Sequence, residues 1–227
     1  MLVELSEVSK GRNGLALPET SVQFTSGRAR LVIAETEQRP TVLGLIASGR
    51  MRPDTGSVVI DGETDAAALR LRVALIDSPD VSEPAPNVTV AGIVAEELMF
   101  AGRRSNPVAA LRWLEESGAR ELARVPLADV APAVRLRLLL ELATLRGGVE
   151  GLVLVSPDRH GGDPHEWWRL AQEFSARGYA VLVIAGQASA TALREGERPV
   201  SRRPRPSRLR QRPTAALGAH GTRGVRP

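Results

Sequence analysis

Residues 27–62 read GRARLVIAETEQRPTVLGLIASGRMRPDTGSVVIDG, and this stretch decides the fold class. Its residues 29–34 form a largely aliphatic run after Gly27, which predicts a central strand. A helix is predicted over about residues 40–48, because proline is well tolerated at a first helical position. Residues 58–63 then predict a strand that runs into an Asp61-Gly62 turn.

The flanking sequence adds strands on both sides of this stretch. Upstream, the spacing of the apolar residues predicts half-buried strands with one shared face, made of Leu5, Val8, Val22 and Phe24. Downstream, short apolar runs predict buried strands at residues 72–76, 151–155 and 179–184. A helix over about residues 164–177 joins the last two strands, which is the length of a parallel crossover.

Residues 89–146 change to a helical pattern. Thr89 and Asn106 are predicted to cap two helices, and Pro132 is predicted to open a third. Together the elements predict an α/β domain with a mainly parallel central sheet, an N-terminal antiparallel β portion and a helical insertion at about residues 89–146.

Composition predicts one domain over residues 1–196 and a disordered basic tail over residues 197–227. The tail holds eight arginines and no acidic residue from residue 199 onward. Subtracting these eight from the 30 basic residues leaves 22 against 26 acidic residues, so the positive formal charge of +4 belongs to the tail. Such a tail can attract nucleic acid or anionic lipid, although it lacks aromatic residues for base stacking.

Other compositional features exclude several classes of protein. The chain has no cysteine, which excludes disulfides and thiolate metal sites. The chain contains no run of 18 apolar residues, so no membrane span is predicted. The N-terminus also lacks the pattern of a secretory signal. These features predict a cytoplasmic protein.

The order of these elements resembles the ATP-binding cassette of ABC transporters, a P-loop NTPase-like fold, over about residues 2–193. The resemblance is most specific in Gly27, Gly49, the Pro53-Asp54-Thr55-Gly56 turn and Asp61-Gly62, which occupy the family's positions without a gap. It implies a phosphate-binding loop between the first strand and the first helix of this stretch.

That loop departs from the family's GxxGxGK[ST] pattern. Ala34, Glu37 and Arg39 stand in place of the three glycines, and Pro40 stands in place of the lysine. The glycines allow backbone N–H groups to surround phosphate oxygens, so side chains here obstruct such a nest. Thr41 alone is retained, and it is the one candidate cofactor-binding residue that the resemblance leaves.

The remaining motifs of the family are also replaced. The family's signature LSGGQ corresponds to residues 130–134, VAPAV, followed by Arg135 and Arg137. The aspartate that organises Mg²⁺ and the glutamate that activates water correspond to Val155 and Ser156. The switch histidine corresponds to Gly186, and the metal-side glutamine to Asp77 or Ser78. We therefore expect no catalytic residue, no metal ligand and no cofactor, ATP with Mg²⁺ included.

The leading hypothesis is a degenerate ABC-type subunit that does not hydrolyse ATP and acts as a structural or regulatory partner of a transport system. Its expected partners are an ABC-type membrane permease or a second cassette subunit, which places it in the cytoplasm or at the inner face of the membrane. Two alternatives stay open. One is a subunit that retains weak ATP binding, and the other is a cytoplasmic scaffold that binds nucleic acid or anionic membrane through residues 199–227.

Three further patterns have an ordinary and a functional interpretation. Residues 156–166 gather two histidines and three acids, which fits a metal site or a serine hydrolase less well than a loop that starts a helix. Trp167 and Trp168 are adjacent and cannot share a helix face, so one is predicted in the core and the other is available for a partner. Met99 and Phe100 lie where the family docks its membrane subunit, or else belong to an ordinary core helix.

Overall fold

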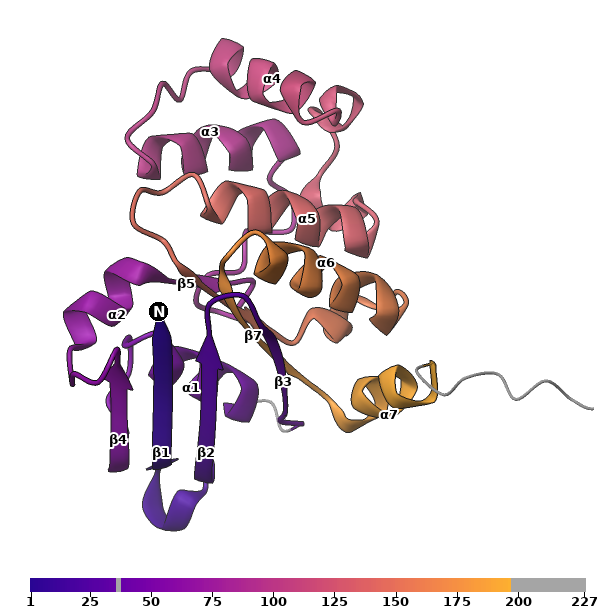
Figure 1. Ribbon diagram of the computed structural model, residues 1–227. Coiled ribbons are helices and arrows are strands. Elements are labelled where there is room, and N and C mark those ends of the chain that lie inside the picture. The colour runs from indigo at the N-terminus through magenta and orange to yellow at the C-terminus, as the bar shows by residue number, and fades with distance from the viewer. Residues whose placement is uncertain (36–37, 197–227) are drawn as a thin grey trace, which may run out of the picture. The chain divides into compact units, whose positions relative to one another are not determined.

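The computed structural model describes residues 1–35 and 38–196. Its strands form an antiparallel sheet in the order β2-β1-β4 and a parallel sheet in the order β3-β7-β6-β5 (Figure 1). Glu37 and the predicted basic tail at 197–227 lie outside the described residues.

A β-bulge shapes the antiparallel sheet, which comprises β1 (Leu2–Lys10), β2 (Leu17–Thr25) and β4 (Thr55–Ile60). Leu5 and Val8 are three residues apart, so a regular strand would point them to opposite faces. The register shifts between them and Glu7 has a φ of 52°, which adds a residue to this strand locally. Leu5 and Val8 are therefore both buried, as are Val22 and Phe24, which confirms the predicted face.

The parallel sheet comprises β3 (Ala29–Ile33), β5 (Val73–Ile76), β6 (Gly151–Val155) and β7 (Ala180–Ala185). Every residue of β6 and β7 is buried, as expected for strands covered on both faces. The prediction of a central position for residues 29–34 is wrong, because β3 is an edge strand of the described sheet. Arg30 interrupts its apolar run and Ile33 is 45% exposed, which suits an edge.

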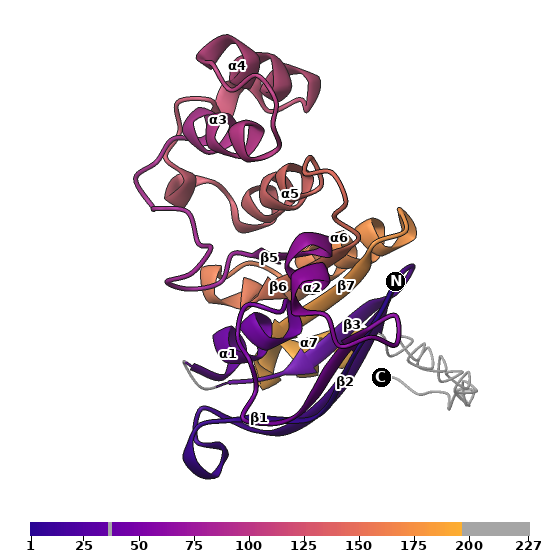
Figure 2. The same ribbon diagram turned by 90° about the vertical axis from the view of Figure 1, so that its left-hand side faces the viewer.

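Two helices flank the antiparallel sheet. Helix α1 (Gln38–Ala47) packs between the two sheets, since its Leu43 and Ile46 share a core with residues of both (Figure 2). Helix α2 (Ala66–Arg72) was not predicted, and Arg72 ends it rather than starting β5. Asp65 starts α2 by accepting two backbone N–H groups at 2.8 and 2.9 Å. The Asp61-Gly62 turn is confirmed, with φ values of 50° and 89°.

The helical region contains α3 (Val90–Phe100), α4 (Pro107–Glu116) and α5 (Pro132–Ala143). The predicted caps are confirmed, because Thr89 Oγ1 accepts the N–H of Gly92 at 3.2 Å and Asn106 Oδ1 accepts that of Ala109 at 2.9 Å. Figures 1 and 2 show α3 and α4 at the end farthest from the antiparallel sheet, with α5 between them and α6.

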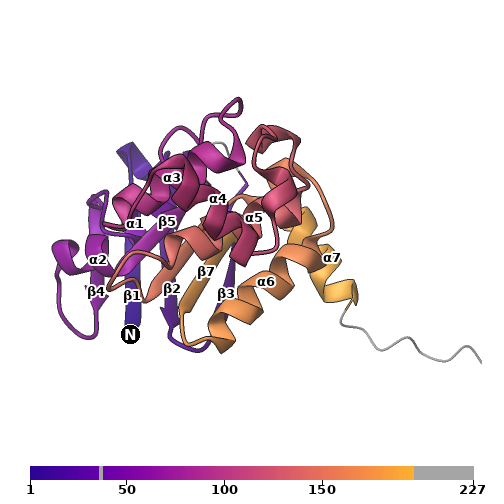
Figure 3. The same cartoon turned by 90° about the horizontal axis from the view of Figure 1, so that it is seen from above.

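Two helices complete the described chain, α6 (Pro164–Ala176) and α7 (Gln187–Gly196). Seen from above, α6 lies over β7 and β3 of the parallel sheet, beside α5 (Figure 3). Short 3-10 helices lie in the connections, at Arg12–Gly14 (η1), Arg120–Leu122 (η2), Leu127–Asp129 (η3) and Pro157–His160 (η4). Within the described ranges, none of the helices combines the length and the apolar character needed to cross a membrane.

Candidate functional site

The four parallel strands end at one edge of the sheet, where open α/β sheets bind their ligands. The residues that follow the strands are Ala34 after β3, Asp77 after β5, Ser156 after β6 and Gly186 after β7. This carboxyl edge is the candidate site, because it brings together several positions that the family resemblance assigns to nucleotide-binding motifs.

The chain between β3 and α1 extends the sheet before it reaches the helix. The N–H of Ala34 donates to the carbonyl oxygen of Ala185 at 3.0 Å, which continues the pairing of β3 with β7. The carboxylate of Glu35 then accepts the N–H of Gln187 at 2.8 Å. Glu35 is therefore held by the start of α7.

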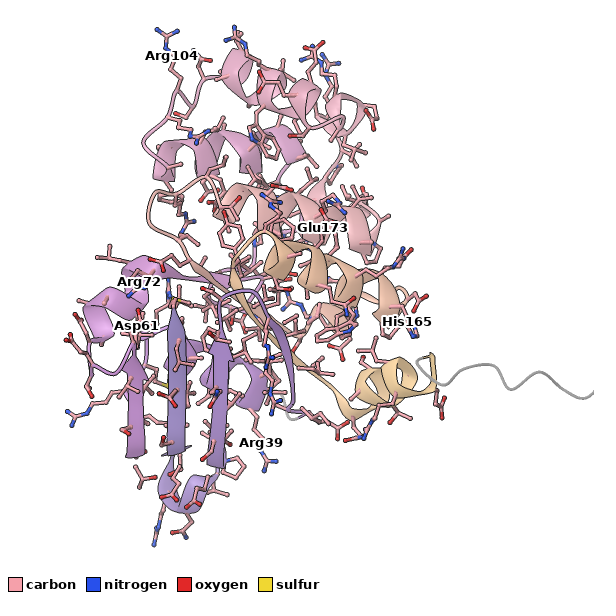
Figure 4. The ribbon with its side chains drawn as sticks, in the orientation of Figure 1. Arg39, Asp61, Arg72, Arg104, His165 and Glu173 are labelled. Atoms are coloured by element: carbon pink, nitrogen blue, oxygen red, sulfur yellow. The ribbon has the colours of Figure 1, made fainter. Side chains whose placement is uncertain are left out.

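The first turn of α1 is poorly suited to phosphate. Pro40 is buried there and has no N–H to donate. Arg39 and Glu35 line a cavity of about 190 Å³, and Arg39 Nε has no hydrogen-bond partner among the described residues (Figure 4). Thr41 is half-buried within α1, and its role as a retained cofactor-binding position stays a prediction.

The end of β6 does not fit a metal ion. Val155 is fully buried in the core that surrounds α1. A Cβ built on Gly44 of α1 would lie only 2.7 Å from Val155 Cγ2, so the helix and the strand are in close contact. Ser156 adopts the left-handed conformation, with φ 47° and ψ 55°. The residues present at this edge therefore do not fit ATP with Mg²⁺.

Two carboxylates at this edge instead hold the start of α7. Oδ2 of Asp158 accepts the N–H of Gly186 at 2.8 Å and the hydroxyl of Ser189 at 2.9 Å. Together with Glu35, it satisfies donors of the first turn, as negative groups do at helix N-termini. A Cβ at Gly186 would lie 3.2 Å from Asp158 Oδ2, so a histidine there would crowd this contact.

A charge network, composed of Asp77, Glu83, Arg135, Arg159 and His160, occupies the rest of the carboxyl edge. Asp77 and Arg135 are buried, and the other three are partly exposed. Asp77 is its centre: Oδ1 lies 2.6 Å from Arg135 Nη2, and Oδ2 lies 2.8 Å from His160 Nε2. Arg159 Nη2 lies 3.1 Å both from Asp77 Oδ1 and from Glu83 Oε1. The network thus joins the end of β5, helix α5 and the 3-10 helix η4.

Burial and neighbouring charges shift the pKa of Asp77 in opposite directions. Its side chain is 3% exposed, and this burial alone would raise the pKa of the carboxyl group. Hydrogen bonds from His160 and Arg135, with the charges of Arg135 and Arg159, outweigh burial and hold the pKa of Asp77 below its ordinary value of 3.8. Asp77 is therefore a buried carboxylate rather than a buried acid.

The ring nitrogen of His160 can satisfy only one of its two neighbours. Nε2 lies 2.8 Å from Asp77 Oδ2 and 3.0 Å from Arg159 Nε. It carries either a proton or a lone pair, so it cannot both donate and accept. We assign it as a donor to Asp77, because a carboxylate only accepts.

A metal ion would compete with the arginines of this network. Oxygens of Asp77 and Glu83 and a nitrogen of His160 lie within 4.8 Å of one another, which is a ligand-like grouping. However, Arg135 and Arg159 already balance the two carboxylates, so a dication would add uncompensated positive charge. The metal interpretation of residues 156–166 is not supported.

The second histidine of that segment lies outside the network. His165 Nδ1 lies 2.9 Å from Oδ1 of Asp163, which also accepts the backbone N–H of His165 at 2.9 Å. Asp163 is thus the cap of α6. The segment separates into a first half, which contributes Arg159 and His160 to the Asp77 network, and a more exposed second half, which starts a helix.

The two tryptophans and the apolar residues at the end of α3 differ in how far they are exposed. Trp167 is buried in the core and Trp168 is half-buried, with their rings edge to face at 6.4 Å. Met99 and Phe100 are 56% and 58% exposed, and Arg146 lies over the Phe100 ring at 5.5 Å from its centroid. Met99 and Phe100 thus lie at the exposed end of α3, whereas Ile93, Val94 and Leu98 of the same helix are buried, as in an ordinary core helix.

Sequence reasoning missed the Asp77 network, although one signal for it was present. Arg135 shares a helix face with Leu138 and Leu142, which are both buried. A charged residue on such a face needs a buried partner. That partner is Asp77, which lies 58 residues away in the chain, so no local pattern reveals it.

No model of a known protein family matches the sequence, and no curated protein matches it. Many solved structures do match. One is cbiO1 from Clostridium perfringens, part of the ABC transporter complex cbiONQ. It has a TM-score of 0.59 and 16% identity, over 81% of this chain and 77% of that chain.

Two more matches point to the same fold. An ABC transporter ATP-binding protein from Pyrococcus furiosus, described as putative, has a TM-score of 0.57 and 14% identity, over 82% of this chain and 92% of that one. An ATP-binding subunit of an ABC transporter has a TM-score of 0.58 and 19% identity, over 86% of this chain and 82% of that one. This chain thus has the fold of the ATP-binding cassette of ABC transporters, with two sheets, helix α1 between them and a helical region.

Proposed function

We propose that this chain is a non-hydrolysing ABC-type subunit, a structural or regulatory partner of a membrane transport system. The observation that carries the proposal is the use of Glu35 and Asp158. Both carboxylates lie at the carboxyl edge, and both bind the first turn of α7. Negative side chains committed to a helix N-terminus leave that edge unfavourable for a triphosphate.

The Asp77 network supports the same proposal. In it, the carboxylate of Asp77 at the sheet edge pairs directly with Arg135 of α5. A subunit whose own side chains hold α5 to the sheet would present a constant surface to its partners.

Titration with ATP and Mg²⁺ by calorimetry tests the proposal. We expect no binding tighter than about 100 μM, which corresponds to about −5.5 kcal/mol. We also expect no phosphate release above that of a buffer blank. An ABC cassette with an intact phosphate loop, measured in the same buffer, serves as the positive control.

The variant Thr41→Ala separates specific from adventitious binding. Binding tighter than about 100 μM that this variant weakens would overturn the proposal in favour of a subunit with residual ATP binding. Binding that Thr41→Ala leaves unchanged and that added salt abolishes belongs to the arginine-rich tail, because purely electrostatic contacts are screened.

The proposed partner is a membrane permease, paired with this chain alone or with a second cassette. The cbiO1 structure from Clostridium perfringens, which has the same fold, is part of an ABC transporter complex. Exposed Met99 and Phe100 at the end of α3 offer an apolar contact for the permease. With such a partner, the chain would act in the cytoplasm, at the inner face of the membrane.

Cell fractionation tests this surface. We expect the protein to sediment with membranes and Phe100→Glu to shift it to the supernatant. Val108→Glu, an equally drastic change at a 66% exposed position on α4, is the matched control. Equal effects of the two substitutions would contradict a specific role for the end of α3.

A second candidate function rests on the charge of residues 199–227, which hold eight arginines and no acid. Such a segment binds nucleic acid or anionic membrane by releasing counterions. Deletion of residues 199–227 should then abolish salt-sensitive association with either. Association that persists after the deletion removes this candidate.

A further inference from the structure

A cavity of about 770 Å³ lies at the other end of α1, away from the carboxyl edge. The end of α1, residues 50–54, β4 and α2 enclose it. Its volume is within the range of about 300–1,000 Å³ that is typical of small-molecule sites. Since α1 has ten residues, about 15 Å of helix separates this cavity from the carboxyl edge.

The charged lining of this cavity is strongly positive. Lys10 is balanced by Asp54, because its Nζ lies 2.6 Å from Asp54 Oδ1. Arg50, Arg52 and Arg70 also line the cavity, and none of them has a carboxylate within 4 Å in the described part of the chain. Three guanidinium groups without a counter-charge therefore border one space.

Two of these arginines have structural contacts that leave donors unused. Arg50 Nη1 donates to the carbonyl oxygens of Ser48 and Val73 at 3.1 and 3.0 Å, and Arg70 Nη1 donates to that of Gly49 at 3.0 Å. The contacts with Ser48 and Gly49 lie at the C-terminal end of α1, which carries only about half an elementary negative charge. Each guanidinium has five N–H donors, so most of them remain available.

The arginines also repel one another. Residue Arg50 is exposed overall, but the end of its side chain that reaches Ser48 and Val73 is partly buried. This burial lowers the pKa of Arg50, and the charges of Arg146 and Arg70 lower it further. A bound anion would relieve that repulsion.

The floor of the cavity is apolar. Ile46, Val58 and Leu69 are buried there, and Met51 is half-buried. An apolar floor next to a cationic rim is complementary to a molecule with a charged head and an apolar body.

We propose that this cavity binds a small organic anion. Its phosphate or carboxylate group would contact Arg50, Arg52 and Arg70, and its apolar body would lie on Ile46, Val58 and Leu69. The proposal is independent of the function proposed above, because it uses none of the residues at the carboxyl edge.

Calorimetric titration of the full chain tests it, with octyl phosphate and octanoate as probes below their micelle concentrations. We expect one of them to bind with one-to-one stoichiometry, and their comparison identifies the preferred head group. Octyl glucoside, which has the same tail without a charge, and inorganic phosphate, which has no tail, should each bind at least tenfold more weakly.

Two variants locate the site. Arg52→Glu, at an exposed position whose side chain makes no hydrogen bond or ion pair with any described residue, should weaken binding of the preferred probe at least tenfold. Ser57→Trp, at an exposed position of β4, should fill the cavity and do the same. The matched control is Arg104→Glu, an identical charge change in the connection between α3 and α4 (Figure 4).

Three results would overturn the proposal. The first is the absence of one-to-one binding by either anionic probe. The second is equal weakening by Arg52→Glu and Arg104→Glu, which would indicate general attraction to the basic tail. The third is binding of octyl glucoside as tight as that of the anionic probes, which would show that apolar contact alone explains the binding and that the arginines have no role.

Discussion

Arg135 Nη2 lies 2.6 Å from Asp77 Oδ1, and this buried ion pair joins helix α5 to the end of β5. Both side chains are almost completely inaccessible, at 5% and 3% exposure. Since a buried charge is costly without a partner, each residue makes the other tolerable.

Removing one partner of the pair should destabilise the protein strongly. We expect Arg135→Met to lower the free energy of unfolding by about 3 kcal/mol, at the low end of the range for broken buried pairs, because Arg159 still contacts Asp77. Urea denaturation measures this change.

A control on the same helix is available. Arg137 pairs with Glu173 at 2.6 Å, but its side chain is 47% exposed. Arg137→Met should cost at most about 1 kcal/mol, as exposed pairs do. Equal losses in the two variants would contradict the special role of the buried pair.

The contribution of Asp77 should depend on pH. The pKa of Asp77 is lowered in the folded state. Its stabilising effect is therefore complete above about pH 3.8, the ordinary pKa, and is lost as the pH falls through the lowered pKa. We expect Asp77→Asn to be much less stable than the parent protein at pH 7, and the gap to narrow at about pH 3. Urea denaturation at the two pH values checks this, and a constant gap would show that the charge of Asp77 is not what stabilises the fold.

The start of α7 should depend on Asp158. We expect Asp158→Ala to speed hydrogen exchange of the amides at residues 186–191 and to cost about 1–2 kcal/mol, as lost helix caps do. Asp163→Ala removes the cap of α6 and should speed exchange at residues 165–167 instead. If Asp158→Ala leaves α7 unchanged, the carboxyl edge is not held as described.

Close packing of α1 on β6 predicts an effect of a single methyl group. A Cβ at position 44 would lie 2.7 Å from Val155 Cγ2, so Gly44→Ala should cost about 1–3 kcal/mol in thermal or urea denaturation. The double variant Gly44→Ala with Val155→Ala should recover part of that loss.

Gly147→Ala is the matched control for this effect. A Cβ there meets nothing within 4 Å, so the change should be neutral or slightly stabilising. A neutral result for Gly44→Ala as well would show that the contact with Val155 can relax.

Much of the fold could be predicted because its signals are local. Caps at Thr89 and Asn106 and the Asp61-Gly62 turn depend on hydrogen bonds or dihedral angles within a few residues. By contrast, α2 has only seven residues, which is about two turns and too short to show a helical period. The edge position of β3 was also missed, because strand order depends on pairing between distant segments.

For the candidate site, the sequence by itself determined what is absent from the phosphate loop. Pro40 lacks an N–H in any structure, and Val155 cannot ligate a metal ion wherever it lies. Only the tertiary structure decided what replaces those groups. Asp77, Arg135 and His160 are far apart in the chain, and only folding brings Arg135 and His160 within hydrogen-bond distance of the buried Asp77. Charge pairing of this kind is a property of positions in space, so residue types alone could not reveal it.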